Sequence, residues 1–348
     1  MGKRDELKEG STNNALSVGK LSPDILEREI LAYRGASRSD VLIGAGIGED
    51  AALIKFTGQK NDKFPLLVVS SDPIVGASEG TGKLLVHVNA NDIACKGGEP
   101  SWFIVTLIVP LRDGLECAKK IMKEIDETCK ELNIAVVGGH TELTDRYDQP
   151  VIVGTMIGKT DYCMDASNIR DGDVILMTRH AGLEGMSIIA ADRPDLLSCL
   201  EKDEIEEVKS WSKKLSVIQA SRALRDIARV MHDPTEGGVI GGLYEFERMS
   251  GLHVKINVSE IPVSPLTRKA ALSIGFDPLH LISSGVLLAA LPEDKADEAS
   301  KRLGEHKIES AVIGKISGNA PKGGDSIKLD TYEELWNILK KGGNGHGF

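Results

Sequence analysis

Five short segments rich in glycine and carboxylate stand at the ends of apolar runs along the chain. They are GIGEDAA (46–52), SSDPI (70–74), NAND (89–92), GGHTE (138–142) and HDPTEGG (232–238). Their carboxylates are Asp50, Asp72, Asp92, Glu142 and Asp233. Any one of these segments alone is equally well explained by an ordinary turn or a solvated surface. Five of them together predict a site for divalent cations and a polyphosphate, because Mg²⁺ prefers oxygen ligands and is held by a few carboxylates plus substrate phosphates.

The glycine loops match neither of the two common nucleotide-binding motifs. GIGEDAA lacks the G-x-G-x-x-G spacing, and AALIKF (51–56) after it is predicted to be a strand rather than a helix. We therefore interpret this segment as a tight loop that brings Asp50 to a shared site. EGTGKLL (79–85) is not a P-loop, because leucine follows Lys83 where Ser or Thr is required. Lys83 remains a candidate phosphate contact, with an ordinary surface lysine as the alternative.

Two further carboxylates have a predicted structural setting. Asp72 ends a buried strand and precedes a proline, which favours an extended backbone. Its carboxylate is therefore expected at the carboxyl end of the strand, where open α/β sheets bind ligands. Asn91 and Asp92 lie within a predicted helix, and such polar side chains need partners such as a metal or phosphate if they are buried. A solvated helix face is the alternative.

The two remaining segments offer candidate phosphate contacts. In GGHTE, adjacent glycines let the backbone approach a ligand closely, so His140 could bind phosphate or metal or move a proton. A lone histidine is more often structural, and both interpretations stay open. In HDPTEGG, Thr235 could cap a helix that begins at Gly237 and Gly238, and the backbone N–H groups there can bind phosphate.

Hydrophobic periodicity predicts strands that alternate with helices along the whole chain. Strands are predicted over 41–46, 51–56, 66–72, 103–110, 134–139, 151–158, 174–178, 253–258, 285–291, 308–316 and 325–330. Helices are predicted over 22–33, 81–96, 114–132, 182–191, 203–229, 239–250, 264–274, 293–304 and 331–341, with Thr81 as the N-cap of the second. The predicted fold class is α+β, with two α/β-type halves whose sheets are covered by helices.

The polar run TDYCMDASNIRDGD (160–173) is the candidate domain boundary. It separates an N-terminal domain over 21–162 from a C-terminal domain over 163–341. Residues 1–20 and the glycine-rich tail 342–348 are expected to be flexible.

Composition narrows the function classes. The chain has 348 residues and a net charge of −10, so a general nucleic-acid backbone binder is not expected. No apolar run reaches transmembrane length, and the polar N-terminus lacks the apolar core of a signal peptide. The 5 cysteines are widely spaced without C-x-x-C, which argues against a disulfide framework or structural zinc and favours a cytoplasmic protein.

The ordered set of motifs, together with GLEG (182–185) and ISSG (282–285), resembles the aminoimidazole-ribonucleotide (AIR) synthase superfamily over about residues 16–340. The superfamily includes thiamine-monophosphate kinase, selenophosphate synthase and the carbamoyl dehydratase of hydrogenase maturation. The likeness is strongest to the AIR synthase-related, hydrogenase-expression-like group. The resemblance implies ATP held with Mg²⁺ between an N-terminal α+β domain and a C-terminal α/β domain, and a homodimer through the N-terminal sheets.

Motif matching then assigns roles to individual residues. The resemblance implies that Asp50, Asp72, Asp92 and Asp233 bind the metal, and that Asp72, Asp92, His140 and Asp233 act in catalysis. The implied cofactor contacts are Gly46, Gly48, Asp50, Lys83, Asn91, Gly138, Gly139, Thr141, Glu142, Thr235 and Gly237.

Two departures from the family patterns separate the function hypotheses. His140 stands where thiamine-phosphate kinases carry aspartate, which argues against a kinase. No cysteine follows Cys199, whereas the carbamoyl dehydratases carry the carbamoyl group on a terminal cysteine. The favoured hypothesis is an ATP- and Mg²⁺-dependent enzyme that phosphorylates an amide, carboxamide or phosphate oxygen of a small molecule or carrier. The alternatives are an ATP-binding accessory protein without turnover, a thiamine-monophosphate-kinase-like phosphotransferase, and a nucleotide-free structural protein.

Overall fold

The computed structural model describes residues 23–25, 27, 39, 41–44, 46–55, 66–318 and 329–341. Most of the helix predicted over 22–33 and of the strand predicted over 325–330 lies outside these residues, as do the predicted flexible ends. Within the described part, helix α1 covers Pro23–Ile25. No helix of the described part is long and apolar enough to cross a membrane.

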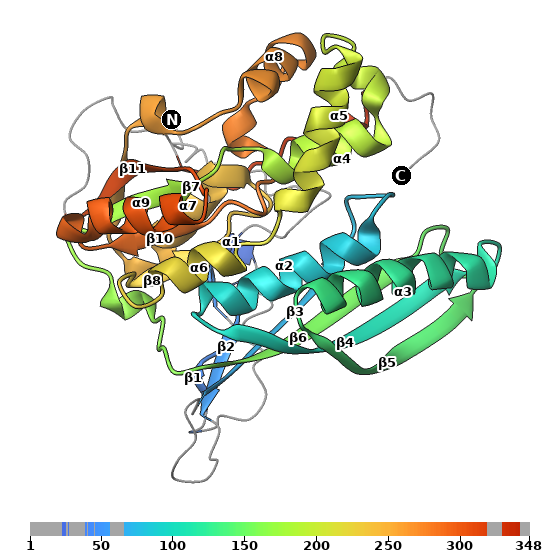
Figure 1. The fold of residues 1–348 in the computed structure, drawn as a ribbon, viewed down its shortest axis with the longest axis horizontal. Coiled ribbons are helices and arrows are strands. Elements are labelled where there is room, and N and C mark those ends of the chain that lie inside the picture. Colours follow the sequence, from blue (N-terminus) through green and yellow to red (C-terminus); the bar gives the residue numbers. More distant parts are fainter. Residues whose placement is uncertain are drawn as a thin grey trace, which may run out of the picture.

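The N-terminal half is built on a six-stranded sheet with the strand order β1-β2-β3-β6-β4-β5 (Figure 1). The strands are β1 (Val41–Ile43), β2 (Ala52–Lys55), β3 (Leu66–Ile74), β4 (Glu99–Pro110), β5 (Ala135–Thr144) and β6 (Val151–Thr160). Only the β4–β5 pair is parallel, whereas all other neighbours pair antiparallel. The α+β prediction is therefore confirmed for this half.

Helices α2 (Thr81–Cys95) and α3 (Gly114–Glu131) cover one face of this sheet (Figure 1). Helix α3 has one apolar face, as predicted. In α2 every residue from Leu84 to Cys95 is buried, because the helix lies between the sheet and the C-terminal half. The predicted N-cap Thr81 is wrong: Gly80 takes that position with a φ of +66°, a conformation that favours glycine.

The C-terminal half contains a five-stranded antiparallel sheet with the order β8-β10-β7-β11-β9. Its strands are β7 (Val174–Thr178), β8 (Val230–His232), β9 (His253–Ile256), β10 (Leu288–Leu291) and β11 (Ser310–Ser317). The α-helices are α4 (Leu183–Asp192), α5 (Lys202–Ser210), α6 (Ile218–Leu224), α7 (Gly238–Ser250), α8 (Pro265–Ile274), α9 (Ala296–Glu305) and α10 (Leu335–Leu339). Short 3₁₀ turns link several of them.

The single helix predicted over 203–229 is wrong. The chain forms α5, a 3₁₀ turn over Trp211–Lys214 and α6, and strand β8 begins after a short turn at Val230. The break has a clear cause: the side chain of Asn91 hydrogen-bonds the backbone at Leu215 and Val217, at 2.9 Å each. A tertiary contact therefore overrides the helical pattern at this point.

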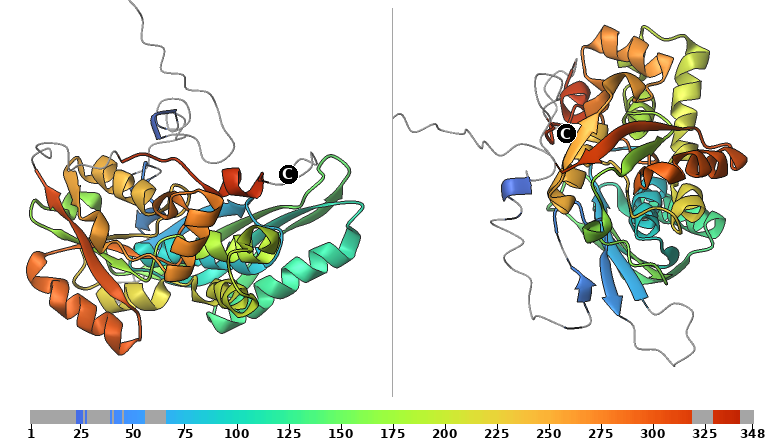
Figure 2. Two further views of the ribbon diagram at one scale, coloured as in Figure 1. Left: turned by 90° about the horizontal axis from the view of Figure 1, so that it is seen from above. Right: turned by 90° about the vertical axis from the view of Figure 1, so that its left-hand side faces the viewer.

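The two halves pack closely against each other, as three perpendicular views show (Figures 1 and 2). One continuous cluster of buried apolar side chains contains residues of both sheets, such as Phe103 and Leu176. Strand β6 ends at Thr160 and β7 begins at Val174. We propose the domain division at 162/163 on this basis.

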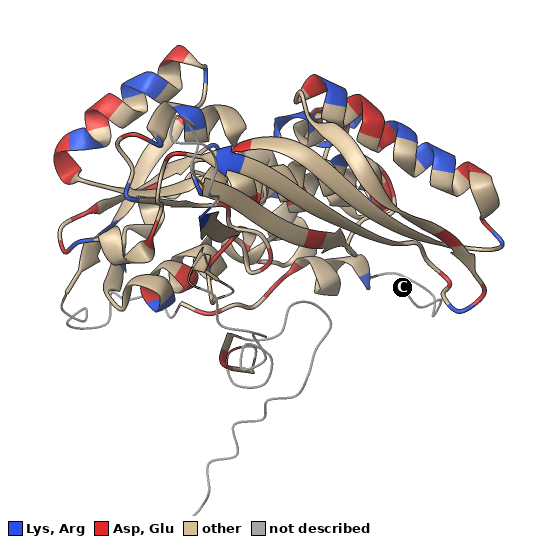
Figure 3. Cartoon of the chain, turned by 90° about the horizontal axis from the view of Figure 1, so that it is seen from below, with Lys and Arg blue, Asp and Glu red and all other residues tan. Residues whose placement is uncertain are grey.

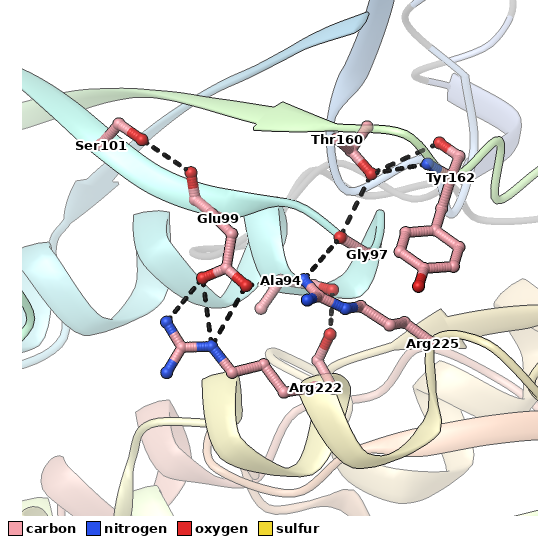
Figure 4. Close-up of polar contacts among 9 residues, drawn as sticks. Ala94, Gly97, Glu99, Ser101, Thr160, Tyr162, Arg222 and Arg225 are labelled. Carbon is pink, nitrogen blue, oxygen red and sulfur yellow. Dashed lines mark hydrogen bonds and ion pairs between the residues drawn. The ribbon is translucent and has the colours of Figure 1, made fainter. Parts of the chain in front are cut away.

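A polar contact joins the end of α2 and the start of β4 to α6 (Figure 4). Arg222 Nη2 donates to Glu99 Oε2 at 2.5 Å, and Arg225 Nη1 donates to Glu99 Oε1 at 2.6 Å. Ser221 Oγ donates to the carbonyl of Ala94 at 2.6 Å. Partial burial opposes the charge of Glu99, but the two arginines outweigh it and lower the pKa of this carboxyl. The contact thus stabilises one relative placement of the two halves.

Candidate active site

Four predicted carboxylates come together between the two halves. Asp50, Asp72 and Asp92 line a cavity of about 560 Å³, and they come from the β1–β2 loop, strand β3 and helix α2. Asp233 directly follows β8 in the other half. One carboxylate oxygen of Asp233, one of Asp50 and Sγ of Cys95 lie within 4.8 Å of one another. The fold therefore gathers into one cluster carboxylates that are far apart in sequence.

Asp72 lies within strand β3 rather than after it, which differs from the expected setting. Strand β3 continues through Pro73 because it pairs with β6 as far as Ile74, whereas β2 pairs only with residues 66–69. From Ser70 onward the other edge of β3 has no neighbouring strand in the described part. There the N–H of Asp72 donates to Asn89 Oδ1 at 3.1 Å, and the carbonyl of Asp72 accepts from Asn89 Nδ2 at 3.3 Å. The side chain of Asp72 lines the cavity.

Ser70 links the carboxylates and was not included in the predicted site. Its Oγ lies 2.5 Å from Asp92 Oδ2, 3.3 Å from Asp72 Oδ2 and 3.1 Å from the carbonyl oxygen of Asp50. A hydroxyl has one proton, so it can donate to only one of these oxygens at a time. The signal in the sequence was the spacing: residues two apart on a strand share one face.

The electrostatics of this acidic cluster favour a cation. Burial raises the pKa of Asp92 well above its ordinary value, and Asp72, Asp233 and Asp50 raise it further. Asp50 Oδ2 is buried and has no hydrogen-bond partner among the described residues. Clustered carboxylates repel one another, and a bound cation offsets that repulsion. The donor set, made of carboxylate oxygens, fits Mg²⁺.

Cys95 belongs to the support of the cluster. Burial raises the pKa of its thiol well above the ordinary range, and Asp233, Asp50 and Asp92 act in the same direction. The thiol is therefore protonated, and its Sγ donates to Asp233 Oδ1 at 3.8 Å. A neutral thiol is a poor ligand for a hard cation, so Cys95 orients Asp233 rather than binding Mg²⁺.

His232 orients Asp50 from the other half of the chain. Its Nδ1 lies 2.6 Å from Asp50 Oδ1, and its Nε2 lies 2.6 Å from Glu245 Oε2 on α7. Burial opposes the charged imidazole, but Asp50 and Glu245 outweigh it and raise the pKa of His232 well above its ordinary value. A ring with carboxylates at both nitrogens donates to both as imidazolium. The sequence-based prediction omitted His232 and Glu245. Glu245 reaches the site only through the packing of α7.

The start of helix α7 contacts a carboxylate of the chain itself. Gly237 is the N-cap with a φ of +88°, and its N–H donates to Glu333 Oε2 at 2.6 Å. Glu333 Oε1 also accepts the N–H groups of Leu335 at 2.8 Å and Ile282 at 3.2 Å. Burial raises the pKa of Glu333 to about 7. The predicted capping role of Thr235 is not observed, but Thr235 lines the cavity.

The family of the protein follows from comparison with known sequences. The AIR synthase related protein N-terminal domain matches residues 48–160, and the corresponding C-terminal domain matches residues 170–323. Together they cover most of the chain, including all four clustered carboxylates. The chain belongs to the AIR synthase related family. This confirms the resemblance inferred from the motifs.

Relatives of this AIR synthase related protein include hydrogenase maturation proteins. A hydrogenase expression/formation protein of Methanocaldococcus jannaschii is 27% identical over 90% of this chain and 91% of the relative. The carbamoyl dehydratase HypE of Escherichia coli K12 is 27% identical over 70% of this chain and 73% of the relative. The crystal structure of E. coli HypE has the same fold, with a TM-score of 0.68 and 23% identity over 78% of this chain and 88% of that chain. A HypE–HypF complex matches with a TM-score of 0.64 at 25% identity over the same shares.

In this family member, the GGHTE segment does not join the acidic cluster. Residues 138–142 lie inside β5 rather than in a loop after it, and β5 is the outer strand of the sheet. Two strands separate β5 from β3, so His140, Thr141 and Glu142 lie about 14 Å across the sheet from Asp72, at about 4.8 Å per strand. His140 is exposed and pairs with Glu142, with 3.2 Å between Nε2 and Oε2.

One glycine of this segment, Gly139, has a packing role. A Cβ added at Gly139 would lie 2.0 Å from the carbonyl oxygen of Val105 on β4, so the close approach is to a neighbouring strand and not to a ligand. Gly138 has no atom within 4 Å of such a Cβ. In the first loop, Gly46 and Gly48 line the cavity, and Gly48 has a φ of +74°.

Asn91 and Lys83 also lie apart from the carboxylates. Both polar atoms of Asn91 bind the backbone of residues 215–217, so Asn91 fixes the packing of the two halves. The neighbour that meets the cluster is Asn89, whose Oδ1 accepts the N–H of Asp72 at 3.1 Å. Lys83 is half-buried on the first turn of α2 and does not line the cavity. Burial lowers its pKa, and Glu131 opposes that shift.

Proposed function

We propose that this protein is an ATP- and Mg²⁺-dependent enzyme that phosphorylates an amide, carboxamide or phosphate oxygen on a small molecule or carrier protein. The observation that carries the proposal is the cluster of Asp50, Asp72, Asp92 and Asp233, in which both halves of the chain take part and two members, Asp92 and Asp233, are buried. The 27% identity to the carbamoyl dehydratase of E. coli supports an enzyme and a role in metalloenzyme maturation of the hydrogenase type.

The cavity suits a nucleotide in size and surroundings. Its volume of about 560 Å³ lies within the range of about 300–1,000 Å³ found for small-molecule sites. Proteins with this fold have been solved with nucleotides: HypE in complex with ATP, and AaThiL complexed with AMPPCP and TMP. These matches, at 24% and 16% identity, show the fold. For this chain, the proposal of a bound nucleotide rests on the acidic cluster.

The residues would act mainly by positioning charge. Bound Mg²⁺ would supply the positive charge that offsets the phosphates of ATP. Asp72 and Asp92 would hold it from the N-terminal half and Asp233 from the C-terminal half, while His232 keeps Asp50 oriented. In the transfer a bond forms between the γ-phosphorus and the acceptor oxygen. The bond from that phosphorus to the β–γ bridging oxygen breaks, and ADP leaves with the electron pair.

The test is calorimetric titration with a non-hydrolysable ATP analogue, with and without Mg²⁺. We expect Mg²⁺-dependent binding by the natural chain, and a loss of at least about tenfold in affinity for Asp72→Asn and for Asp92→Asn. The matched control is Asp126→Asn, which removes an exposed carboxylate on α3. Circular dichroism checks that each variant is folded. Unchanged affinity in the Asp72 and Asp92 variants would sink the site assignment.

Turnover separates an enzyme from an accessory protein. The natural chain with Mg²⁺, ATP and a panel of amides should release ADP above the background of hydrolysis without an acceptor. Binding of Mg·ATP with no acceptor-dependent ADP release would instead favour the accessory protein.

We also propose a homodimer through the outer face of the six-stranded sheet. Figure 3 shows that this face, turned away from α2 and α3, carries few charged residues. Ile104 of β4 is an exposed apolar side chain on this face, because its neighbours Phe103 and Val105 point to the other side of the sheet and are buried. A dimer would cover Ile104, and GGHTE could then contribute to the site of a second copy. Sedimentation should give a dimer for the natural chain and a shift towards monomer for Ile104→Glu.

A further inference from the structure

A second cavity of about 300 Å³ lies beside the acidic one. Both cavities are lined by Asp72, Val88, Thr235, Glu236, Glu333 and Trp336. Its volume is at the lower end of small-molecule sites, which start at about 300 Å³. A molecule in this second cavity would therefore lie next to whatever occupies the acidic one.

Most of the wall of the second cavity is apolar. Residues 73–77 after the β2-paired part of β3 form one side, and Leu84 of α2 and Ile188 of α4 add to it. Leu335 and Trp336 of α10 complete it. These two residues lie beyond residue 323, where the match to the family model ends. The wall suits the apolar body of a small ligand.

Two polar atoms of residues in this wall have no hydrogen-bond partner among the described residues. Ser284 Oγ and Trp336 Nε1 are buried and make no hydrogen bond within the described part of the chain. Ser284 is only 1% exposed. Buried polar groups are normally hydrogen-bonded, so an orphaned pair in one cavity points to a ligand that satisfies both. An indole N–H only donates, whereas a hydroxyl donates or accepts, so the ligand must present at least one acceptor oxygen.

The charges around the second cavity decide what kind of oxygen-bearing ligand fits. Its lining includes the carboxylates Asp72, Glu184, Glu236 and Glu333, and no lysine or arginine among the described residues. Glu184 is almost completely buried, at 2% exposure. An anionic ligand would face this repulsion without compensation. A neutral carbonyl compound avoids it, and a carboxamide also offers N–H groups to Ser284 and the carboxylates.

We propose that the second cavity binds the acceptor of the phosphoryl transfer, as a small neutral molecule with an apolar body and a carbonyl-type head group. Trp336 Nε1–H donates to the carbonyl oxygen, and Ser284 Oγ forms a hydrogen bond with the other polar atom of the head group. Asp72 and Thr235 line both cavities, so the head group lies beside the occupant of the acidic cavity. This inference rests on the proposed function, because it takes ATP to be the occupant of the acidic cavity.

Three probes of matched shape and different charge test the assignment: benzamide, benzoate and benzylamine. Ligand-observed NMR on the full chain, with Mg²⁺ and a non-hydrolysable ATP analogue present, measures their affinities. We expect benzamide to bind at least about tenfold more tightly than benzoate. Trp336→Phe keeps an aromatic ring but removes the N–H, and Ser284→Ala removes the hydroxyl. Each should weaken benzamide about fivefold, the usual effect of one hydrogen bond.

The matched control is Trp102→Phe, which makes the same change on β4 away from both cavities and should leave benzamide binding unchanged. Benzoate or benzylamine binding as tightly as benzamide, or full affinity in Trp336→Phe, would overturn the neutral carbonyl assignment. Calorimetry of Mg·ATP binding on the same samples separates a failure of the proposed function from a failure of this inference alone. Loss of ATP binding in the natural chain refutes the proposed function, whereas normal ATP binding without benzamide binding refutes only this inference.

Discussion

The substitution Glu333→Gln tests whether a buried carboxyl group destabilises the fold at neutral pH. Glu333 lies between the start of α7 and the two cavities, and its carboxyl oxygens accept three backbone N–H groups. Burial nevertheless raises its pKa from the ordinary 4.5 to about 7. Glutamine keeps nearly the same shape and one acceptor oxygen, but it cannot ionise.

The sign and size of the effect follow from this pKa. Between pH 4.5 and about 7 the folded chain holds the Glu333 proton more tightly than the unfolded chain, so the free energy of unfolding falls as pH rises. A shift of that size, at about 1.36 kcal/mol per unit, amounts to roughly 3 kcal/mol. The loss is complete above about pH 7. The Gln variant lacks this decrease, so its stability relative to the natural chain should increase by about 2.5 kcal/mol from pH 5 to pH 8, since part of the loss has already occurred at pH 5.

The assay is urea unfolding followed by tryptophan fluorescence at pH 5, 6, 7 and 8, with circular dichroism as a second probe of two-state behaviour. Comparing the variant with the natural chain at each pH cancels all other titrating groups. Glu334→Gln is the matched control, because it removes the neighbouring carboxylate, which lines neither cavity. A constant difference between Glu333→Gln and the natural chain across this range would refute the reasoning.

Three further substitutions test the packing of the fold. Gly139→Ala should detach β5 and lower the melting temperature, because its Cβ would meet the carbonyl oxygen of Val105 at 2.0 Å; Gly138→Ala is the control, and equal melting of both would contradict this account. Asn91→Ala leaves two backbone groups of residues 215–217 without their partner and should cost about 2–4 kcal/mol in urea unfolding, with circular dichroism spectra unchanged. Glu99→Gln should remove about 1 kcal/mol of stability at pH 7. Because the pKa of Glu99 is lowered, that difference should decrease as pH falls below its ordinary value of 4.5, and a difference independent of pH would show that the ion pairs contribute nothing.

Much of the fold could be predicted from the sequence because local pattern and tertiary packing agree there. The helix predicted over 114–132 has an apolar stripe on one face, and the structure has α3 at Gly114–Glu131. The strand predicted over 174–178 coincides with β7. The helix predicted over 203–229 failed because Asn91, more than a hundred residues away, binds the backbone in its middle. No periodicity within that segment records such a contact.

The sequence by itself determined the chemistry of the site: carboxylates beside glycines, enough of them to suggest a cation and a polyphosphate. It also indicated the family through the order of its motifs. Only the tertiary structure decided which residues meet. It joins Asp50 to His232, adds Ser70 and Glu333, and places His140 on the outer strand of the sheet. The reason is physical: residue type and spacing set what a side chain can do, whereas strand order and helix packing set its neighbours, and these depend on contacts between distant parts of the chain.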